Sequence, residues 1–424
     1  MNTKESNVHS SSVKQAAKEN HYIHGLVYDP IPFAGGSKIA TLEMLMATKE
    51  SLINNPSANI KFTIVTSDPQ SWKAATTSVT ANIITLPNWS FLTVPQGLRY
   101  WIAQLTLALM LLITLIREPK IHYAVGASNP GIDMALYMVQ WIWRMPIIQL
   151  VHGPVGLSRS IGYCFTRAES VFYLASSLAS IQNALHCYFS KTHDQEQAQI
   201  IVNAVISDAR FESFINGLTQ TNWPTQSNTA SCDLFWAASL LKWKGLETLC
   251  SALDIANKHT PWNANICYIT PQNTHLGIST LPTENTHTKL FHAPNNLDKI
   301  RANSGIFVST SHNEPFGLSV LESLAAGLCV VIPNDGAYWD QALEHNVNCV
   351  KFNPQDPQSL YNTVQSLIDN PQLRRRLSQA SLETAMQYRA DRCYQSISIA
   401  MSAHIYQEQA ISTSTSSSLE TSHD

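Results

Sequence analysis

Seven residues separate two glutamates, Glu314 and Glu322, and the first three of these form a Pro-Phe-Gly turn at 315–317. The turn opens an apolar segment that reads as a helix, so the amides of Leu318 and Ser319 lie in its first turn. Such amides lack intrahelical acceptors and occupy the positive end of the helix dipole, where phosphate is a common ligand. Carboxylates bind hydroxyl groups. A ligand with hydroxyls beside a diphosphate, such as a nucleotide-sugar, fits both halves. The alternative is a capped helix with two exposed glutamates.

The segment Glu-Pro-Phe-Gly-Leu-Ser that begins at Glu314, followed by Glu322, resembles the E-x7-E signature of retaining glycosyltransferases of family 4. Residues 327–333, Gly-Leu-Cys-Val-Val-Ile-Pro, are similar to the small-residue turn and buried strand that follow it in that family. The resemblance implies an α/β protein of GT-B fold. Two Rossmann-like domains would face each other across a ligand cleft, and a C-terminal helix would cross back to the first domain.

Residues 236–245 are similar to the family's strand and loop that carry an arginine and then Lys-Gly, whose cations reach the donor phosphates. Lys244 takes the lysine position, but Ser239 stands where the family has the arginine. Arginine offers a planar bidentate fork, whereas serine offers one hydroxyl. Lys242 could compensate, although its alternating spacing points it away. The alternative for Lys244 is a surface lysine that precedes a helix.

The first domain offers two further pieces. Gly35 and Gly36 precede a helix, and paired glycines let a backbone approach a phosphate closely. They resemble the family's first glycine-rich loop, which lies over the donor diphosphate; the alternative is a flexible turn. His152 closes a strand at a position where the family often has a histidine near the sugar ring. A hydrogen-bonded loop histidine is the alternative.

The resemblance implies the remaining roles. Glu314 would hold sugar hydroxyls and Glu322 ribose hydroxyls, while Gly317 opens the anion-binding helix. Gly336, in the loop at 334–337, would shape the donor pocket with its backbone amide. The leaving phosphate oxygen would take the acceptor proton. We expect no cofactor beyond the nucleoside-diphosphate-sugar donor and no metal site, since Asp29 is a lone carboxylate. The segment 270–274 lacks the family's glycine-rich loop, so the nucleoside base cannot be named.

Composition narrows the setting of this chemistry. The chain has 424 residues, a net charge of −3 and only 13% charged residues, which gives nucleic-acid binding no electrostatic support. The eight cysteines form no C-x-x-C pair, and we interpret them as reduced residues of a reducing compartment. The first twenty residues lack the apolar stretch of a signal peptide. These features predict a cytoplasmic protein, with peripheral contact at the inner face of the membrane as an option.

The segment 100–116 carries that option. It is nearly all apolar and has the minimum length that spans a bilayer. We favour a helix buried in the first domain, because Gln104, Thr106 and Thr114 interrupt the run. A membrane-contacting helix is the alternative.

Strand-like and helix-like segments alternate along the chain, which predicts parallel sheets covered on both faces. Within this alternation, residues 180–189 are expected to hold a helix and a short strand. We expect a polar tail at 1–20, an acceptor-side domain at 21–215 and a linker at 216–231. A donor-binding domain at 232–389, a crossing helix at 390–411 and a disordered tail at 412–424 complete the chain.

The expected function is retaining transfer of a hexose from a nucleoside-diphosphate sugar to a hydroxyl of a glycan or lipid-linked acceptor, in surface polysaccharide or glycolipid assembly. Two alternatives stay open. A sugar-nucleotide-binding or scaffolding protein of the same fold is favoured by Ser239. A phosphorylase-like enzyme of GT-B fold is the other, although no lysine-anchored pyridoxal site is recognisable.

Overall fold

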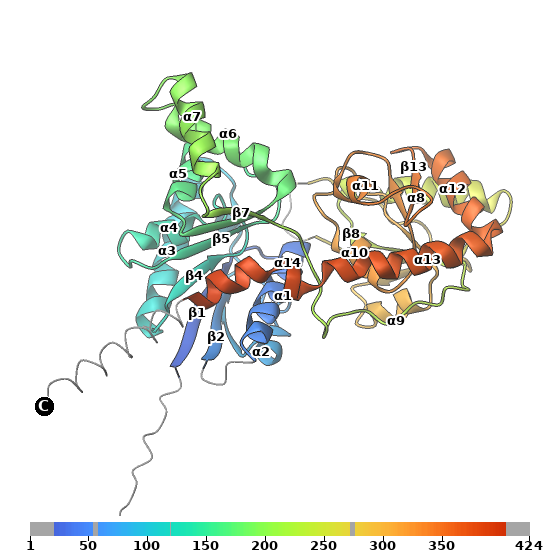
Figure 1. Ribbon diagram of the computed structural model, residues 1–424, viewed down its shortest axis with the longest axis horizontal. Coiled ribbons are helices and arrows are strands. Elements are labelled where there is room, and N and C mark those ends of the chain that lie inside the picture. The colour runs from blue at the N-terminus through green and yellow to red at the C-terminus, as the bar shows by residue number, and fades with distance from the viewer. Residues whose placement is uncertain (1–20, 54–57, 119, 272–275, 404–424) are drawn as a thin grey trace, which may run out of the picture.

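The computed structural model describes residues 21–53, 58–118, 120–271 and 276–403. The expected tails at 1–20 and 412–424, and the part of the crossing helix at 404–411, lie outside these residues. The described chain forms two α/β domains, each built on a parallel sheet, and the two lie side by side (Figure 1). The expectation of two parallel-sheet α/β domains is confirmed.

The N-terminal sheet has the strand order β3-β2-β1-β4-β5-β6-β7, and every neighbouring pair is parallel. Its strands are β1 (His21–Asp29), β2 (Ala58–Thr66), β3 (Ala81–Thr85), β4 (Tyr123–Gly126), β5 (Ile147–Val151), β6 (Ser170–Leu174) and β7 (Phe211–Phe214). Its helices are α1 (Gly36–Ser51), α2 (Ala75–Ser78), α3 (Gly97–Arg117), α4 (Met134–Gln140), α5 (Arg159–Arg167), α6 (Leu178–Phe189) and α7 (Gln195–Ile206). Strands β4 and β5 are buried throughout, as sheets covered on both faces require.

The C-terminal sheet repeats the first six positions of this order as β10-β9-β8-β11-β12-β13. Its strands are β8 (Leu234–Ser239), β9 (Ala264–Ile269), β10 (Thr288–His292), β11 (Ile306–Val308), β12 (Cys329–Pro333) and β13 (Val350–Phe352). Its helices are α8 (Leu246–Asn257), α9 (Leu297–Ala302), α10 (Leu318–Ala325), α11 (Tyr338–Ala342), α12 (Pro357–Asp369) and α13 (Pro371–Ala385). The order reverses between β8 and β11, so the loops that follow these two strands flank the switch point where ligands of such sheets bind.

The chain returns to the N-terminal domain after α13, as expected. The short helix α14 (Ala390–Cys393) and the helical residues 395–403 pack on α1 (Figure 1). There the hydroxyl of Thr48 donates to Ser398 Oγ at 3.2 Å. The Tyr394 hydroxyl donates to Asn216 Oδ1 at 3.2 Å, at the end of the N-terminal domain. The returning segment therefore ties the C-terminal domain to the N-terminal one.

The two domains also share apolar packing. One continuous buried cluster contains Met44 and Ala47 of α1 together with Phe316 and Leu321 of the C-terminal domain. Helix α1 thus lies against the region of α10. Burial of apolar area across the boundary stabilises this arrangement of the domains.

Two local expectations were wrong. Residues 180–189 contain no short strand, since α6 is helical through Phe189. Helix α3 is not buried as a whole: Leu107 and Leu111 are buried, whereas Leu105 and Leu109 on the other face are about 60% exposed. The exposed face of α3 is compatible with the alternative of a membrane-contacting helix.

Candidate functional site

Two loops at the switch point of the C-terminal sheet are joined by their backbones. The loop after β8 holds Lys244 and Gly245, and the loop after β11 holds Thr310 and His312. The Thr310 hydroxyl donates to the carbonyl of Lys244 at 2.8 Å, and the amide of His312 donates to the carbonyl of Trp243 at 2.8 Å. Gly245 has φ +69°, and a Cβ there would lie 2.2 Å from the Thr310 carbonyl oxygen. Only glycine allows this close approach.

The approach brings Lys244 to Glu314. The two side chains form an ion pair, and they are 16% and 17% exposed. Lys244 Nζ also lies 4.0 Å from the centre of the Trp243 ring, a cation–π contact. The ammonium is therefore held in one place, within reach of solvent and of a ligand. This pair joins the two residue sets that the sequence singled out most strongly.

The first turn of α10 lies beside the pair. Gly317 has φ +80° where the chain enters the helix, and a Cβ there would lie 3.0 Å from Cγ of Glu314. In the described structure neither the Leu318 amide nor the Ser319 amide has a hydrogen-bond acceptor. The Ser319 hydroxyl donates instead to the Ala237 carbonyl at 2.9 Å. Two unpaired amides at a helix N-terminus and one ammonium make an anion site.

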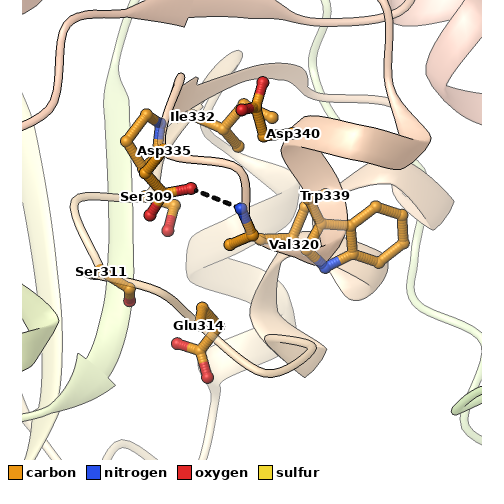
Figure 2. Close-up of a pocket in the computed structure, with 10 residues that line it drawn as sticks. Ser309, Ser311, Glu314, Val320, Ile332, Asp335, Trp339 and Asp340 are labelled. Carbon is orange, nitrogen blue, oxygen red and sulfur yellow. Dashed lines mark hydrogen bonds between the residues drawn. The ribbon is translucent and has the colours of Figure 1, made fainter. Parts of the chain in front are cut away.

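A cavity surrounds these groups. One hollow is lined by Lys244, Glu314, Gly317 and Ser319, and a second hollow shares Glu314 with it. Figure 2 shows the second one, in which Glu314 and Asp335 stand on separate loops. The cavity is open at the edge of the domain and carries groups of both charges.

The loop at 334–337 is held by carboxylates rather than left with free amides. The Gly336 amide donates to Asp340 Oδ2 at 2.7 Å, and the Ala337 amide donates to Asp335 Oδ1 at 3.0 Å (dashed in Figure 2). Asp335 also accepts from the Asn313 amide at 2.9 Å, next to Glu314. Gly336 therefore reaches a ligand by its backbone only if that bond opens. Sequence reasoning missed Asp335, which fixes the Glu314 loop; its place directly after β12 was the available signal.

Glu322 has a partner that the sequence did not indicate. Arg301 Nη1 lies 2.5 Å from Glu322 Oε2, and Arg301 Nη2 lies 2.9 Å from Asp298 Oδ1. The Glu322 side chain is 20% exposed and does not line either hollow. The Glu322 carboxylate is therefore already engaged by a cation in the structure.

Ser239 ends β8 and is half-buried, and it brings no charge to the site. Lys242 does not replace the missing arginine. Its side chain is exposed and lies along Gly277, where a Cβ would be 3.3 Å from Lys242 Cδ. Lys244 is thus the cation that lines the cavity in the described structure.

The glycine-rich loop of the N-terminal domain faces α10. A Cβ on Gly36 would lie 3.9 Å from Cδ1 of Leu318, while none would meet an atom within 4 Å at Gly35. Gly35 therefore borders open space, whereas Gly36 is in van der Waals range of Leu318 at the start of α10. Two residues after Gly36, Lys38 is buried in an ion pair with Asp29.

Asp29 is fully engaged in the core. It accepts from Lys38, and from Trp72 Nε1 at 2.8 Å. Within the described residues, no three His, Cys, Asp or Glu side chains are grouped as a metal site would need.

His152 lies on the N-terminal side of the boundary between the domains. Its Nε2 is 3.2 Å from the Thr41 hydroxyl of α1, and its ring meets Phe214 edge-on at 5.7 Å between centres. Its Nδ1 is buried without a hydrogen-bond partner in the structure. Burial lowers the pKa of His152 to about 4, so the ring is neutral at pH 7. A neutral ring with one unpaired nitrogen can serve a ligand hydroxyl.

Comparison with known proteins gives a family match for part of the chain and a shared fold for most of it. Residues 222–384 match the family described as "Glycosyl transferases group 1". No curated protein sequence matches the chain. Among solved structures, the Anabaena protein HepE in complex with UDP-glucose superposes with a TM-score of 0.63 at 15% identity, over 90% of this chain and 100% of that one.

Two more solved structures share the architecture. A glycosyltransferase from Rickettsia africae has a TM-score of 0.59 at 13% identity, over 89% of this chain and 98% of that one. Sucrose-phosphate synthase from Thermosynechococcus elongatus has a TM-score of 0.57 at 12% identity, over 92% of this chain and 100% of that one. The chain has the GT-B fold, and its C-terminal half contains a glycosyltransferase group 1 domain.

Proposed function

We propose that this protein is a retaining glycosyltransferase of family 4, which transfers a hexose from a nucleoside-diphosphate sugar to an acceptor hydroxyl. The observation that carries the proposal is the Lys244–Glu314 ion pair beside the unpaired amides of Leu318 and Ser319. These groups lie inside the region that matches glycosyltransferases of group 1. The bound UDP-glucose of the HepE structure, on a similar fold, supports a nucleotide-sugar donor.

In the proposed reaction the bond between the anomeric carbon and the diphosphate oxygen breaks. A bond from the acceptor oxygen to the same face of that carbon forms. The acceptor proton passes to the leaving phosphate oxygen, which balances charge and needs no separate base. The transition state is oxocarbenium-like, and negative charge grows on the diphosphate. Stabilisation of that charge is the main task of the protein.

Three groups would stabilise the diphosphate. Lys244 supplies a full charge, the α10 amides supply the helix N-terminus, and the Gly35–Gly36 loop covers the ligand from the other domain. In the structure Lys244 is paired with Glu314. A diphosphate competes for the ammonium and thereby frees Glu314 to accept from sugar hydroxyls. Donor binding and sugar recognition are then coupled through one ion pair.

The remaining residues serve the ends of the donor. His152 offers a neutral ring nitrogen to the sugar, and Glu322 offers its carboxylate to the ribose. Ser239 and Gly336 stand next to Ala238 and Ala337, which line the two hollows. We further propose a glycan or lipid-linked acceptor in surface polysaccharide or glycolipid assembly, and a cytoplasmic protein in peripheral contact with the membrane. No cofactor takes part.

Ser239 favours a second candidate, a protein of the same fold that binds sugar nucleotides with weakened or lost transfer. With Lys242 directed along Gly277, a single cation faces the diphosphate. A hydrogen bond from serine replaces a charge-assisted pair of bonds, which are about twice as strong. A site with one cation can still bind a sugar nucleotide, but it stabilises the charge that grows on the diphosphate during transfer less well.

Thermal shift with uridine, adenosine and guanosine diphosphates tests the binding part. At a ligand concentration of 100 Kd the native state gains about 2.7 kcal/mol, so the melting temperature rises by several degrees. Lys244→Ala should abolish the shift, whereas Lys258→Ala, at an exposed lysine on the surface after α8, should keep it. Absence of a shift with every diphosphate contradicts both candidates.

Turnover separates the candidates. Release of nucleoside diphosphate from UDP-hexose with an acceptor present supports transfer, and the anomeric configuration of the product, read by NMR, decides retention. Binding without turnover supports the second candidate. Sugar phosphate formed when orthophosphate replaces the acceptor would instead indicate a phosphorylase.

A further inference from the structure

Helix α3 carries an apolar stripe that no part of the described chain covers. Its members recur every three or four residues along one face and are 42% to 77% exposed; they are Leu98, Ile102, Leu105, Leu109, Ile113 and Ile116. At 1.5 Å per residue the stripe is about 27 Å long. Single exposed apolar residues are common, but a continuous row of this length marks an interaction surface.

The opposite face of α3 shows that the helix lies on the domain and does not leave it. Ala103, Leu107, Leu111 and Leu115 are buried against the core of the N-terminal domain. Gln104 Oε1 accepts from the Ala135 amide at 3.0 Å. Among the described residues, α3 is the one helix long and apolar enough to cross a membrane. With one face packed on protein, it suits a position parallel to a surface.

Exposed tryptophans lie on α3 and next to the segments that pack against it. Trp101 lies one position before Ile102 and is 44% exposed, and Trp89, in the turn that packs on the start of α3, is 50% exposed. Trp141 follows α4, which packs along α3, and is 73% exposed. Tryptophan is enriched where an apolar layer meets water and headgroups. These tryptophans fit a bilayer surface better than a dry contact between proteins.

Charge decides the kind of surface. Arg99 and Arg117 are exposed and lie near the two ends of α3. Lys120 shortly follows α3 in the sequence, Arg144 shortly follows α4, and both are exposed. Between Asp68 and Glu118 the sequence contains no acidic residue. A cationic rim around an apolar stripe complements anionic headgroups, each basic residue contributing about 1 kcal/mol near such a surface.

We propose that the α3 stripe docks this protein on a bilayer that contains anionic lipid. The apolar side chains enter the boundary between headgroups and acyl chains, and the arginines remain among the headgroups. Helix α3 lies on the side of the N-terminal domain away from the C-terminal domain (Figure 1). Docking through α3 therefore does not involve the C-terminal domain, and it requires neither donor nor acceptor.

Vesicle flotation of the full chain tests the proposal. Wild type should bind vesicles of phosphatidylglycerol and phosphatidylethanolamine, and it should bind pure phosphatidylcholine at least tenfold less. The triple variant I102S/L105S/L109S should lose at least tenfold in binding. Its matched control I200S/V347S/I399S removes three side chains of similar exposure, 50% to 61%, at scattered positions and should bind like wild type.

A second pair of substitutions keeps the proposal testable if the triple variant does not fold. R99Q/R117Q alters only exposed residues and should weaken binding to anionic vesicles by about fivefold per arginine, with little change on phosphatidylcholine. Failure of wild type to bind, or equal binding by the stripe variant and its control, overturns the proposal. So does a wild-type dimer that the stripe variant splits without any vesicle binding, since the stripe would then join two copies.

Discussion

Lys244 and Glu314 form an ion pair although 70 residues separate them, because the loops after β8 and β11 meet at the switch point of the C-terminal sheet. Each side chain is largely but not fully buried. The remaining exposure leaves both charged groups within reach of a ligand. The proposed function depends on that access.

Glu314→Gln should lower kcat for sugar transfer by at least two orders of magnitude. The amide keeps the shape of the side chain but accepts poorly from sugar hydroxyls, and it no longer balances Lys244. Circular dichroism should show an unchanged fold. Glu383→Gln on α13, an exposed glutamate far along the chain, is the matched control and should leave turnover unaltered. Wild-type transfer by Glu314→Gln would refute the assignment of Glu314.

Ser239→Arg should strengthen donor binding. The position ends β8 beside the cavity, and a guanidinium there would add a second cation to Lys244. A charge-assisted hydrogen bond contributes about 1.5–3 kcal/mol, so we expect Kd for the diphosphate to fall by roughly tenfold or more. Isothermal titration calorimetry measures it, with Ser239→Gln as a control for size. A higher Kd for the arginine variant than for the glutamine one would show that this site does not face phosphate.

The parts of the site that the sequence predicts are those set by local chemistry. Gly317, in the turn before α10, and Gly245, after Lys244, both have positive φ, 80° and 69°. Glycine adopts such conformations readily, so the sequence itself indicates the turns. The alternation of side chains correctly directed Lys242 away from the cavity. Such features need no knowledge of distant contacts.

Long-range partners escape that reasoning. The pairing of Arg301 with Glu322 follows from the way α9 packs beside α10, which no local pattern records. The wrong strand assigned within 180–189 has a similar origin. The run Ala-Leu-His-Cys-Tyr-Phe has the composition of a strand, yet packing on α5 and α7 holds it as helix α6.

His152 should stay neutral at physiological pH, and it should make the free energy of unfolding of the protein fall in acid. Burial lowers its pKa from 6.5 to about 4, so the unfolded chain binds more protons between these values. The free energy of unfolding therefore falls as pH drops from about 6.5 towards 4. His152→Gln should lose less stability than wild type between pH 7 and pH 5 in urea titrations.

His24 provides the control for this experiment. Burial lowers its pKa to about 4 as well, but it bonds Thr63 inside the sheet. His24→Gln should change the pH dependence of stability in the same direction and leave the kcat of folded protein unchanged. His152→Gln should change both. An inflection of wild-type activity near pH 6.5 that disappears in His152→Gln would contradict a neutral His152.

Glu43, which contacts the linker between the domains, should give the free energy of unfolding a pH dependence opposite in sign to that of His152. Its side chain is 1% exposed, and its carboxylate accepts from the Thr219 amide at 2.7 Å and from Asn222 Nδ2 at 2.6 Å. Burial raises its pKa above the ordinary 4.5, so the folded state holds the proton more tightly than the unfolded state. The free energy of unfolding that Glu43 contributes is largest below pH 4.5 and declines as pH rises through the raised pKa.

Glu43→Gln removes this titration, and its one amide oxygen can still accept from the buried Thr219 amide. The stability of wild type minus that of Glu43→Gln should therefore decrease from pH 4.5 upward, measured by urea unfolding at several pH values. Glu43→Ala leaves the buried Thr219 amide of the linker unpaired and should cost about 1–3 kcal/mol. Because Glu43 joins α1 to the linker, the alanine variant should also expose the linker to limited proteolysis. A difference that grows with pH would mean that Glu43 is held ionised, and that its contact with the linker gains stability from the charge.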